Sequence, residues 1–68
     1  MIKSQIGINA GKVWQFLDEK KESSLKEIKS ELSLKNEDLW LALGWLAREN
    51  KVFFYKENKD YRITLVYD

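Results

Sequence analysis

The sequence predicts an α+β fold in which three helices precede a β-hairpin. Apolar residues recur at helical spacing in three segments before residue 50, and beyond it they recur at every second residue. The two segments with the shorter period, 51–56 and 61–67, are rich in aromatic and β-branched side chains, as β-strands are. A chain of 68 residues is expected to form one domain, 1–68.

The first helix is predicted between about residues 5 and 21. Its apolar positions fall on one helical face, which consists of Ile6, Ala10, Val13, Trp14 and Leu17. A second interpretation makes Asn9 the N-cap and leaves residues 1–8 as an extended arm. Both interpretations stay open, because Gly7 and Gly11 weaken the helical signal at this end.

A capping box marks the start of the second helix, because Ser24 is followed three residues later by Glu27. The helix itself is predicted over about 25–32, and a tight turn at 33–35 follows it. A short strand at 23–25, just before the helix, could pair with the hairpin.

The third helix is predicted to begin after Asn36, which is expected to be its N-cap, and to end at Asn50. Residues 57–60, between the two β segments, are turn formers. The resulting order is helix, helix, tight turn, helix and hairpin. This is the order of a winged helix-turn-helix, in which the hairpin is the wing.

Four short segments strengthen this prediction. They are "AGKVW" at 10–14, "LKNEDL" at 34–39, "ALGWLAREN" at 42–50 and "KVFFY" at 51–55. Together they resemble a small prokaryotic family of stand-alone winged helix-turn-helix domains of uncharacterised function. The resemblance covers nearly the whole chain and implies the fold and, by analogy, dimerisation. It implies no catalytic residues and no established ligand.

Composition excludes several classes of protein. The chain has no Cys and no His, which excludes disulfides and ordinary zinc, haem or iron–sulfur sites, so we expect no metal and no cofactor. No segment is long and apolar enough for a membrane helix, and no secretion signal begins the chain, which favours the cytoplasm. The sequence contains no phosphate-binding glycine loop and no marked carboxylate pair. We therefore expect neither enzyme activity nor a small-molecule ligand.

The third predicted helix has two different faces. Leu39, Leu43 and Leu46 form a stripe that is expected to pack in the core. The opposite face, which would enter the major groove in a DNA-reading winged helix, carries Leu41, Gly44, Trp45 and Arg48. These residues offer one basic group and little else that could contact base edges or phosphates. We therefore predict that this face is a protein interface.

Trp45 has three interpretations. It is a singly exposed aromatic residue, or the N-terminal segment covers it, or it contacts another chain. Gly44 favours the third, because glycine in mid-helix costs about 1 kcal/mol relative to alanine and permits another chain to approach closely. In an antiparallel partner helix, Arg48 would meet Glu37 or Asp38, as a two-fold contact requires. The sequence thus predicts a homodimer.

Basic residues near the second helix and the hairpin are candidate contacts for double-stranded DNA. They are Lys26, Lys29, Lys35, Lys56, Lys59 and Arg62. The competing interpretation is a solvated surface of i,i+4 ion pairs, because acidic residues alternate with the lysines of the second helix. Twelve basic and eleven acidic residues leave a net charge of +1, less than a typical nucleic-acid binder carries. DNA binding is therefore expected to be weak and sensitive to salt.

Two functions remain open at this point. The first is a DNA-associated transcriptional regulator that acts as a homodimer, which is the commonest use of the fold. The second is a protein-interaction module that does not bind DNA, which the third helix and the near-neutral charge favour.

Aromatic residues in the hairpin could stack on single-stranded bases. Alternate hairpin residues must pack on the helices, however, so that only one face is left for stacking.

Overall fold

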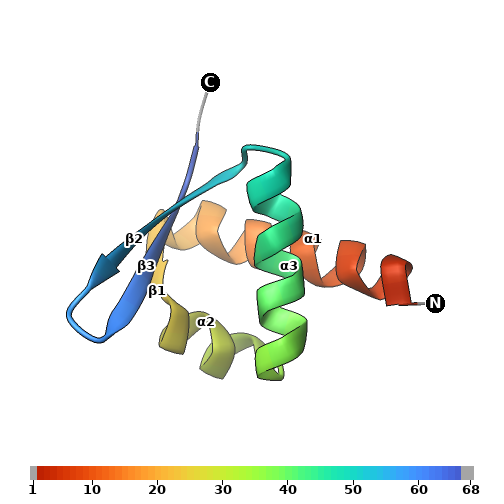
Figure 1. Ribbon diagram of the computed structural model, residues 1–68, viewed down its shortest axis with the longest axis horizontal. Helices are drawn as coiled ribbons and strands as arrows, with labels where there is room; N and C mark the ends of the chain where they lie inside the picture. Colours follow the sequence, from red (N-terminus) through yellow and green to blue (C-terminus); the bar gives the residue numbers. More distant parts are fainter. Residues whose placement is uncertain (1, 67–68) are drawn as a thin grey trace.

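The computed structural model describes residues 2–66, which form three helices and a three-stranded antiparallel sheet (Figure 1). The elements are α1 (Ile2–Lys20), β1 (Glu22–Ser24), α2 (Leu25–Leu32), α3 (Asn36–Arg48), β2 (Val52–Glu57) and β3 (Asp60–Leu65). The predicted α+β class and element order are confirmed. The sheet has one strand more than the predicted hairpin, because β1 pairs with β3. No helix within residues 2–66 is long and apolar enough to cross a membrane.

Helix α1 begins at Ile2, which is earlier than either interpretation of the sequence predicted. The interpretation with an extended N-terminal arm is wrong for residues 2–8, which are helical; residue 1 lies outside the described residues. Asn9 is not an N-cap but a buried residue, 4% exposed, whose side-chain oxygen accepts a hydrogen bond from Gln5 Nε2 at 3.2 Å. Of the predicted core face, Ala10, Val13 and Leu17 are buried.

The N-terminal cap of α2 is half of the predicted capping box. Ser24 Oγ accepts a hydrogen bond from the backbone N–H of Glu27 at 3.1 Å. The Glu27 carboxylate accepts a hydrogen bond from the hydroxyl of Ser23 at 2.6 Å. In a complete capping box it would instead accept one from the backbone N–H of Ser24. Ser23 is fully buried and lies opposite Ile63 in the sheet. Strand β1 and the start of α2 are therefore fastened together.

Helix α3 begins one residue before the predicted start. The N-cap is Lys35, which makes no side-chain capping bond, so the prediction that Asn36 is the cap is wrong. The preceding turn places Lys35 in an extended conformation, with its carbonyl accepting a hydrogen bond from Leu39 N–H at 2.9 Å. Helical hydrogen bonding thus begins at Lys35, and Asn36 is already in the first turn.

The C-terminal end of α3 agrees with the prediction. Asn50 adopts a left-handed conformation, with φ at 58°. Its N–H donates to Ala47 O at 3.0 Å, and the N–H of Lys51 donates to Leu46 O at 2.9 Å, which is the Schellman arrangement. The carbonyl of Lys51 also accepts a hydrogen bond from Val66 N–H at 2.9 Å, so the helix end is joined to the end of β3.

The sheet has the strand order β1-β3-β2. The strands of the hairpin extend to the facing pair Glu57 and Asp60, so the turn consists of Asn58 and Lys59 rather than the four predicted residues. Asn58 takes the left-handed conformation that such a short turn needs, with φ at 57°. The last residue of the second predicted β segment, 67, lies outside the described residues.

The core lies between the helices and one face of the sheet. Of the two faces that the sequence allowed for β2, the one with Val52 and Phe54 packs inward, whereas Phe53 and Tyr55 are exposed. The buried apolar residues are Ala10, Val13, Leu17, Ile28, Leu39, Ala42, Leu43, Leu46, Val52, Ile63 and Leu65. The predicted core stripe of the third helix is among them. Figure 1 shows α3 in front of α1, with its opposite side facing solvent.

Candidate functional site

The solvent side of α3 carries a line of four residues, here called the outer stripe: Glu37, Leu41, Gly44 and Arg48. Their spacing of four, three and four residues places them on one helical face. All four are exposed, and 43% of the surface of Leu41 is accessible. Neither Glu37 nor Arg48 forms an ion pair with any other residue in the range 2–66. Three of the four predicted interface residues therefore share this surface.

Trp45, the fourth predicted interface residue, lies to one side of the outer stripe. It is half-buried and packs against the core. Its neighbours on α1 include Gly7, Ala10 and Gly11, which line the same pocket. Of the three interpretations of Trp45, the one in which the N-terminal segment covers it is nearest to the structure, although that segment is a helix.

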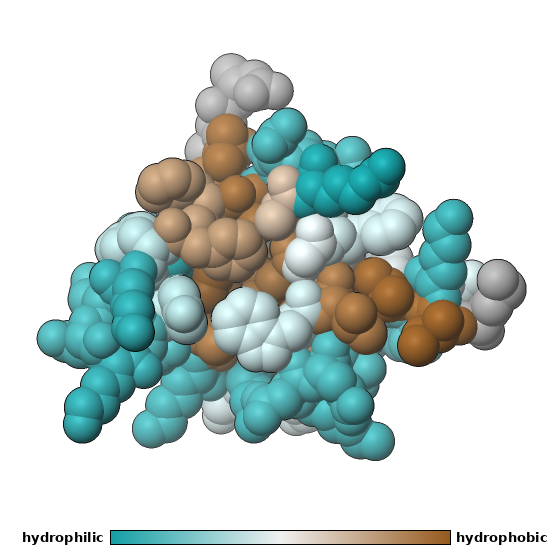
Figure 2. Space-filling model, in the orientation of Figure 1, coloured by the Kyte–Doolittle hydropathy of each residue, from teal (hydrophilic) through white to brown (hydrophobic). Residues whose placement is uncertain are grey.

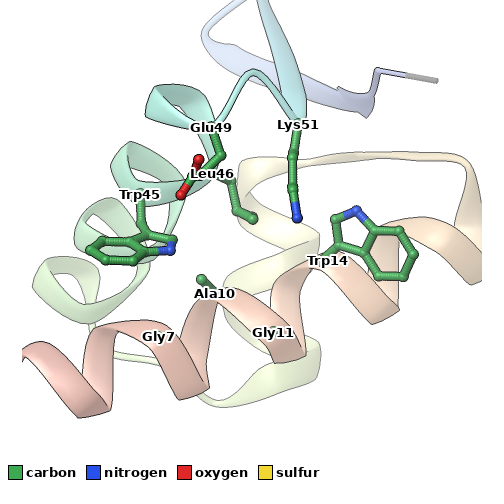
Figure 3. A pocket seen from close by; sticks show the side chains of 8 residues that line it. All are labelled: Gly7, Ala10, Gly11, Trp14, Trp45, Leu46, Glu49 and Lys51. Carbon is green, nitrogen blue, oxygen red and sulfur yellow. The ribbon is translucent and has the colours of Figure 1, made fainter. Parts of the chain in front are cut away.

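The pocket beside Trp45 has a volume of about 330 Å³ and lies between α1 and the C-terminal end of α3. Figure 3 shows the indoles of Trp14 and Trp45 on opposite sides of it, with the Lys51 side chain reaching towards the gap. Gly7 and Gly11 leave its α1 side open, since a Cβ at either position would meet no atom within 4 Å. Sequence reasoning missed this pocket, because only the packing of α1 on α3 creates it.

Apolar surface extends beyond the outer stripe towards the sheet. Trp40 is 45% exposed and packs edge-to-face against Tyr61 of β3, with ring centroids 5.8 Å apart. Figure 2 shows a band of apolar and weakly polar surface across the middle of the face that presents α3. Hydrophilic surface borders this band along its lower edge. The side of α3 that faces solvent is thus suited to bury apolar area against a partner.

Five exposed lysines lie on α2, the turn after it and the hairpin. This set, here called the lysine rim, consists of Lys26, Lys29, Lys35, Lys56 and Lys59. All five are exposed, and none forms an ion pair within residues 2–66, so the i,i+4 pairs expected on α2 are not formed. In Figure 1, α2 and the hairpin tip lie to the left of α3, and the turn after α2 meets its lower end. Five of the six predicted nucleic-acid contacts are therefore exposed and without an ion-pair partner among the described residues.

Arg62, the sixth candidate, is engaged within the sheet. Its Nη2 donates to Glu22 Oε1 at 2.8 Å, and the hydroxyl of Tyr55 donates to the same oxygen at 3.4 Å. The hydrogen bond to Glu22 and the attraction of the Glu22 and Glu57 carboxylates hold the pKa of Arg62 above its ordinary value. Arg62 is therefore charged but occupied in joining β1 to the hairpin. Sequence reasoning placed it with the other bases because the pairing of β1 with β3 was only a suggestion.

Residues 1–65 match the model of a protein family described as "Winged helix-turn-helix domain (DUF2582)". The chain belongs to this family. The family assignment agrees with the resemblance seen in the sequence and with the order of the elements in the structure.

Two other comparisons agree with membership of the winged helix-turn-helix family. The chain is 36% identical over 63 residues to "Uncharacterized protein MJ1608" of Methanocaldococcus jannaschii, and the match covers 90% of each protein. It is also similar to the solution NMR structure of protein BT2368 from Bacteroides thetaiotaomicron, with a TM-score of 0.83 and 43% identity. That match covers 96% of this chain and 79% of the other. The names of these two proteins state no activity and no partner.

Proposed function

We propose that the protein is a DNA-associated transcriptional regulator that binds double-stranded DNA as a homodimer through the lysine rim. The observation that carries this proposal is the presence of five exposed lysines on α2, the turn after it and the wing, none with an ion-pair partner within residues 2–66. Lysine side chains bind phosphates as point charges, and wings and helix-turn-helix edges are common places for such contacts.

The chemistry of α3 supports contacts with phosphates and not with bases. Base edges are read mainly by Arg, Lys, Asn, Gln, Ser and Thr. Of the outer stripe only Arg48 belongs to this set, and the other three residues are Leu41, Gly44 and an acidic Glu37. Glu37 lies in the first turn of α3 and would repel a phosphate backbone. We therefore propose binding with little sequence preference, in which the released counterions supply most of the free energy.

The test measures the affinity for a mixed-sequence DNA duplex by fluorescence anisotropy over a range of salt concentrations. The variant Lys56→Gln/Lys59→Gln is expected to bind more weakly. The slope of log K against log salt is expected to fall by up to about 2 per protomer, since each phosphate contact contributes about 0.9. The matched control is Lys3→Gln/Lys12→Gln, which removes the same charge from exposed positions on α1 and should change the slope little.

Two outcomes would overturn the proposal. One is the absence of binding by the unaltered protein at low salt and at protein concentrations on the order of tens of micromolar, where non-specific binders associate with DNA. The other is an equal loss of slope in both double variants, because net charge alone would then explain the binding and the lysine rim would have no special role.

The second candidate is a protein-interaction module that does not bind DNA. The observation that favours it is the outer stripe, whose exposed Leu41 and Gly44 are suited to protein contact and not to a phosphate backbone. The net charge of +1 also fits this function better than it fits strong DNA binding. Absence of DNA binding together with self-association through α3 would favour this candidate.

A further inference from the structure

We infer that the outer stripe binds the outer stripe of a second copy, with the two α3 helices antiparallel about a two-fold axis. The axis passes midway between Ala42 and Leu43. This inference rests on the homodimer of the proposed function and gives it a surface and a register. It does not depend on DNA binding.

The positions of the stripe are symmetric about its midpoint, and their residues complement each other: acidic with basic, and large with small. Glu37 and Arg48 lie at equal distances along the chain from the midpoint between Ala42 and Leu43. Leu41 and Gly44 are also equidistant from it, only nearer. When two such helices meet head to tail at their midpoints, Glu37 of each faces Arg48 of the other, at about 8 Å from the axis. Leu41 of each then lies at the height of the other's Gly44.

The charges select this orientation over the alternatives. Glu37 and Arg48 are exposed and have no ion-pair partner within residues 2–66, so both are available for contact. The antiparallel register satisfies both charges of both copies, whereas a parallel pair would place Glu37 against Glu37 and Arg48 against Arg48. Antiparallel packing also places the negative end of each helix dipole beside the positive end of the other.

Gly44 provides a second, independent argument. A Cβ at this position would meet no atom within 4 Å, and the backbone has no positive φ, so the fold of one copy does not require glycine here. Glycine in mid-helix nevertheless costs about 1 kcal/mol relative to alanine. In the antiparallel pair, Gly44 lets the two helices approach closely at their centre. Trp40, about 40° around the helix from Gly44, adds exposed aromatic area beside the contact.

A second copy suits this surface better than another partner. Glu37 disfavours DNA, and the stripe is complementary in charge and size to its own antiparallel copy, as a two-fold contact requires. The lysine rim lies on α2, the turn after it and the hairpin, and so it is not part of the surface that the inferred dimer uses. One helix per copy buries less than the roughly 1,200 Å² of a standard interface, so we expect dissociation constants in the micromolar range.

The test is sedimentation equilibrium of the full chain with two charge reversals, Glu37→Arg and Arg48→Glu, made singly and together. Each single variant is expected to dissociate at least about tenfold more readily, because two like-charge pairs replace two ion pairs in every dimer. The double variant restores opposite charges across the axis and is expected to regain the original affinity. It is also the matched control, because it restores the net charge of +1 of the original sequence.

Three results would overturn the inference. They are a protein that stays monomeric at about 100 µM, single variants that associate as the original does, and a double variant that fails to regain association. Circular dichroism of each variant excludes unfolding as the cause. The DNA proposal is tested separately, since Lys56→Gln/Lys59→Gln is expected to dimerise normally. A protein that stays monomeric but binds DNA would contradict dimerisation and leave the proposed DNA binding standing.

Discussion

Glu22 determines which basic residues are available on the wing. Its carboxylate lies on the outer face of the sheet and accepts hydrogen bonds from Arg62 and Tyr55, two residues that are neighbours across the hairpin. Arg62 is thereby directed towards β1, whereas Lys56 and Lys59 point into solvent without partners within residues 2–66. Because Glu22 binds Arg62, that cation has a structural role, whereas Lys56 and Lys59 of the same hairpin remain candidate DNA contacts.

Glu22→Gln is expected to strengthen DNA binding. The substitution removes the carboxylate that holds Arg62 and raises the net charge from +1 to +2, so one more cation becomes available. The salt slope should rise by up to about 1 per protomer. The measurement is the same anisotropy titration, and Arg62→Gln in the original background is the control that should change the slope little. A loss of slope in Arg62→Gln as large as that in Lys56→Gln would contradict this assignment.

The end of α3 depends on one residue with an unusual backbone conformation. Asn50 has a left-handed backbone conformation. The two hydrogen bonds of the Schellman arrangement are donated by its own N–H and by the N–H of Lys51. Asparagine tolerates this conformation better than other residues with a Cβ, and glycine tolerates it best. The stability of the connection between α3 and the wing therefore rests partly on the backbone preference of residue 50.

Asn50→Ala is expected to lower the free energy of unfolding by about 1 kcal/mol, because alanine is strained at positive φ. Asn50→Gly should leave the protein at least as stable as it is now. Urea unfolding followed by circular dichroism measures both changes. Asn36→Ala is the control: its side chain makes no capping bond to α3, so the loss should be small. Equal losses in Asn36→Ala and Asn50→Ala would mean that the left-handed conformation contributes nothing.

Local patterns predicted the elements, and tertiary contacts decided the details that were missed. Helical spacing found the core stripe of α3, and the left-handed end at Asn50 followed from residue type. The cap at Asn36 failed because the geometry of the turn before it, and not side-chain preference, determines where α3 begins. The contact of Ser23 with Glu27, which fastens β1 to α2, joins residues close in sequence but depends on burial against the sheet.

The candidate surfaces were predictable to a similar degree. Leu41, Gly44 and Arg48 share a face by helical spacing alone, so the sequence was enough to group them. Trp45 lies at the border between that face and the side covered by α1, and only the position of α1 decides its surroundings. The occupation of Arg62 likewise requires β1, which lies some 40 residues earlier in the chain.

The whole molecule has a small core and an apolar face that the monomer leaves exposed. A 68-residue chain without disulfides has few sources of stability beyond its core. Association of folded chains adds stability, because unfolded chains do not form the same contact. The outer stripe can therefore affect stability as well as recognition.

The melting temperature is expected to rise with protein concentration. If dimers predominate, a tenfold increase should raise it by about 3 to 6 °C for a domain of this size. Arg48→Glu, which opposes like charges across the axis, should show a melting temperature that depends less on concentration. Thermal melts by circular dichroism over a hundredfold range of concentration measure both. A constant melting temperature in the original protein would count against dimerisation.

Lys51 links the two surfaces described above through its backbone. Its N–H closes the end of α3, and its carbonyl accepts the hydrogen bond from Val66 at the end of the wing. In the proposed dimer, a change in the position of α3 would reach the hairpin that carries Lys56 and Lys59 through these two hydrogen bonds. Two binding events that shift the same element are thermodynamically linked, and each changes the affinity of the other by the same factor. If both proposals hold, dimerisation through the outer stripe would therefore change the affinity of the hairpin lysines for DNA, and DNA would change the affinity of the dimer equally.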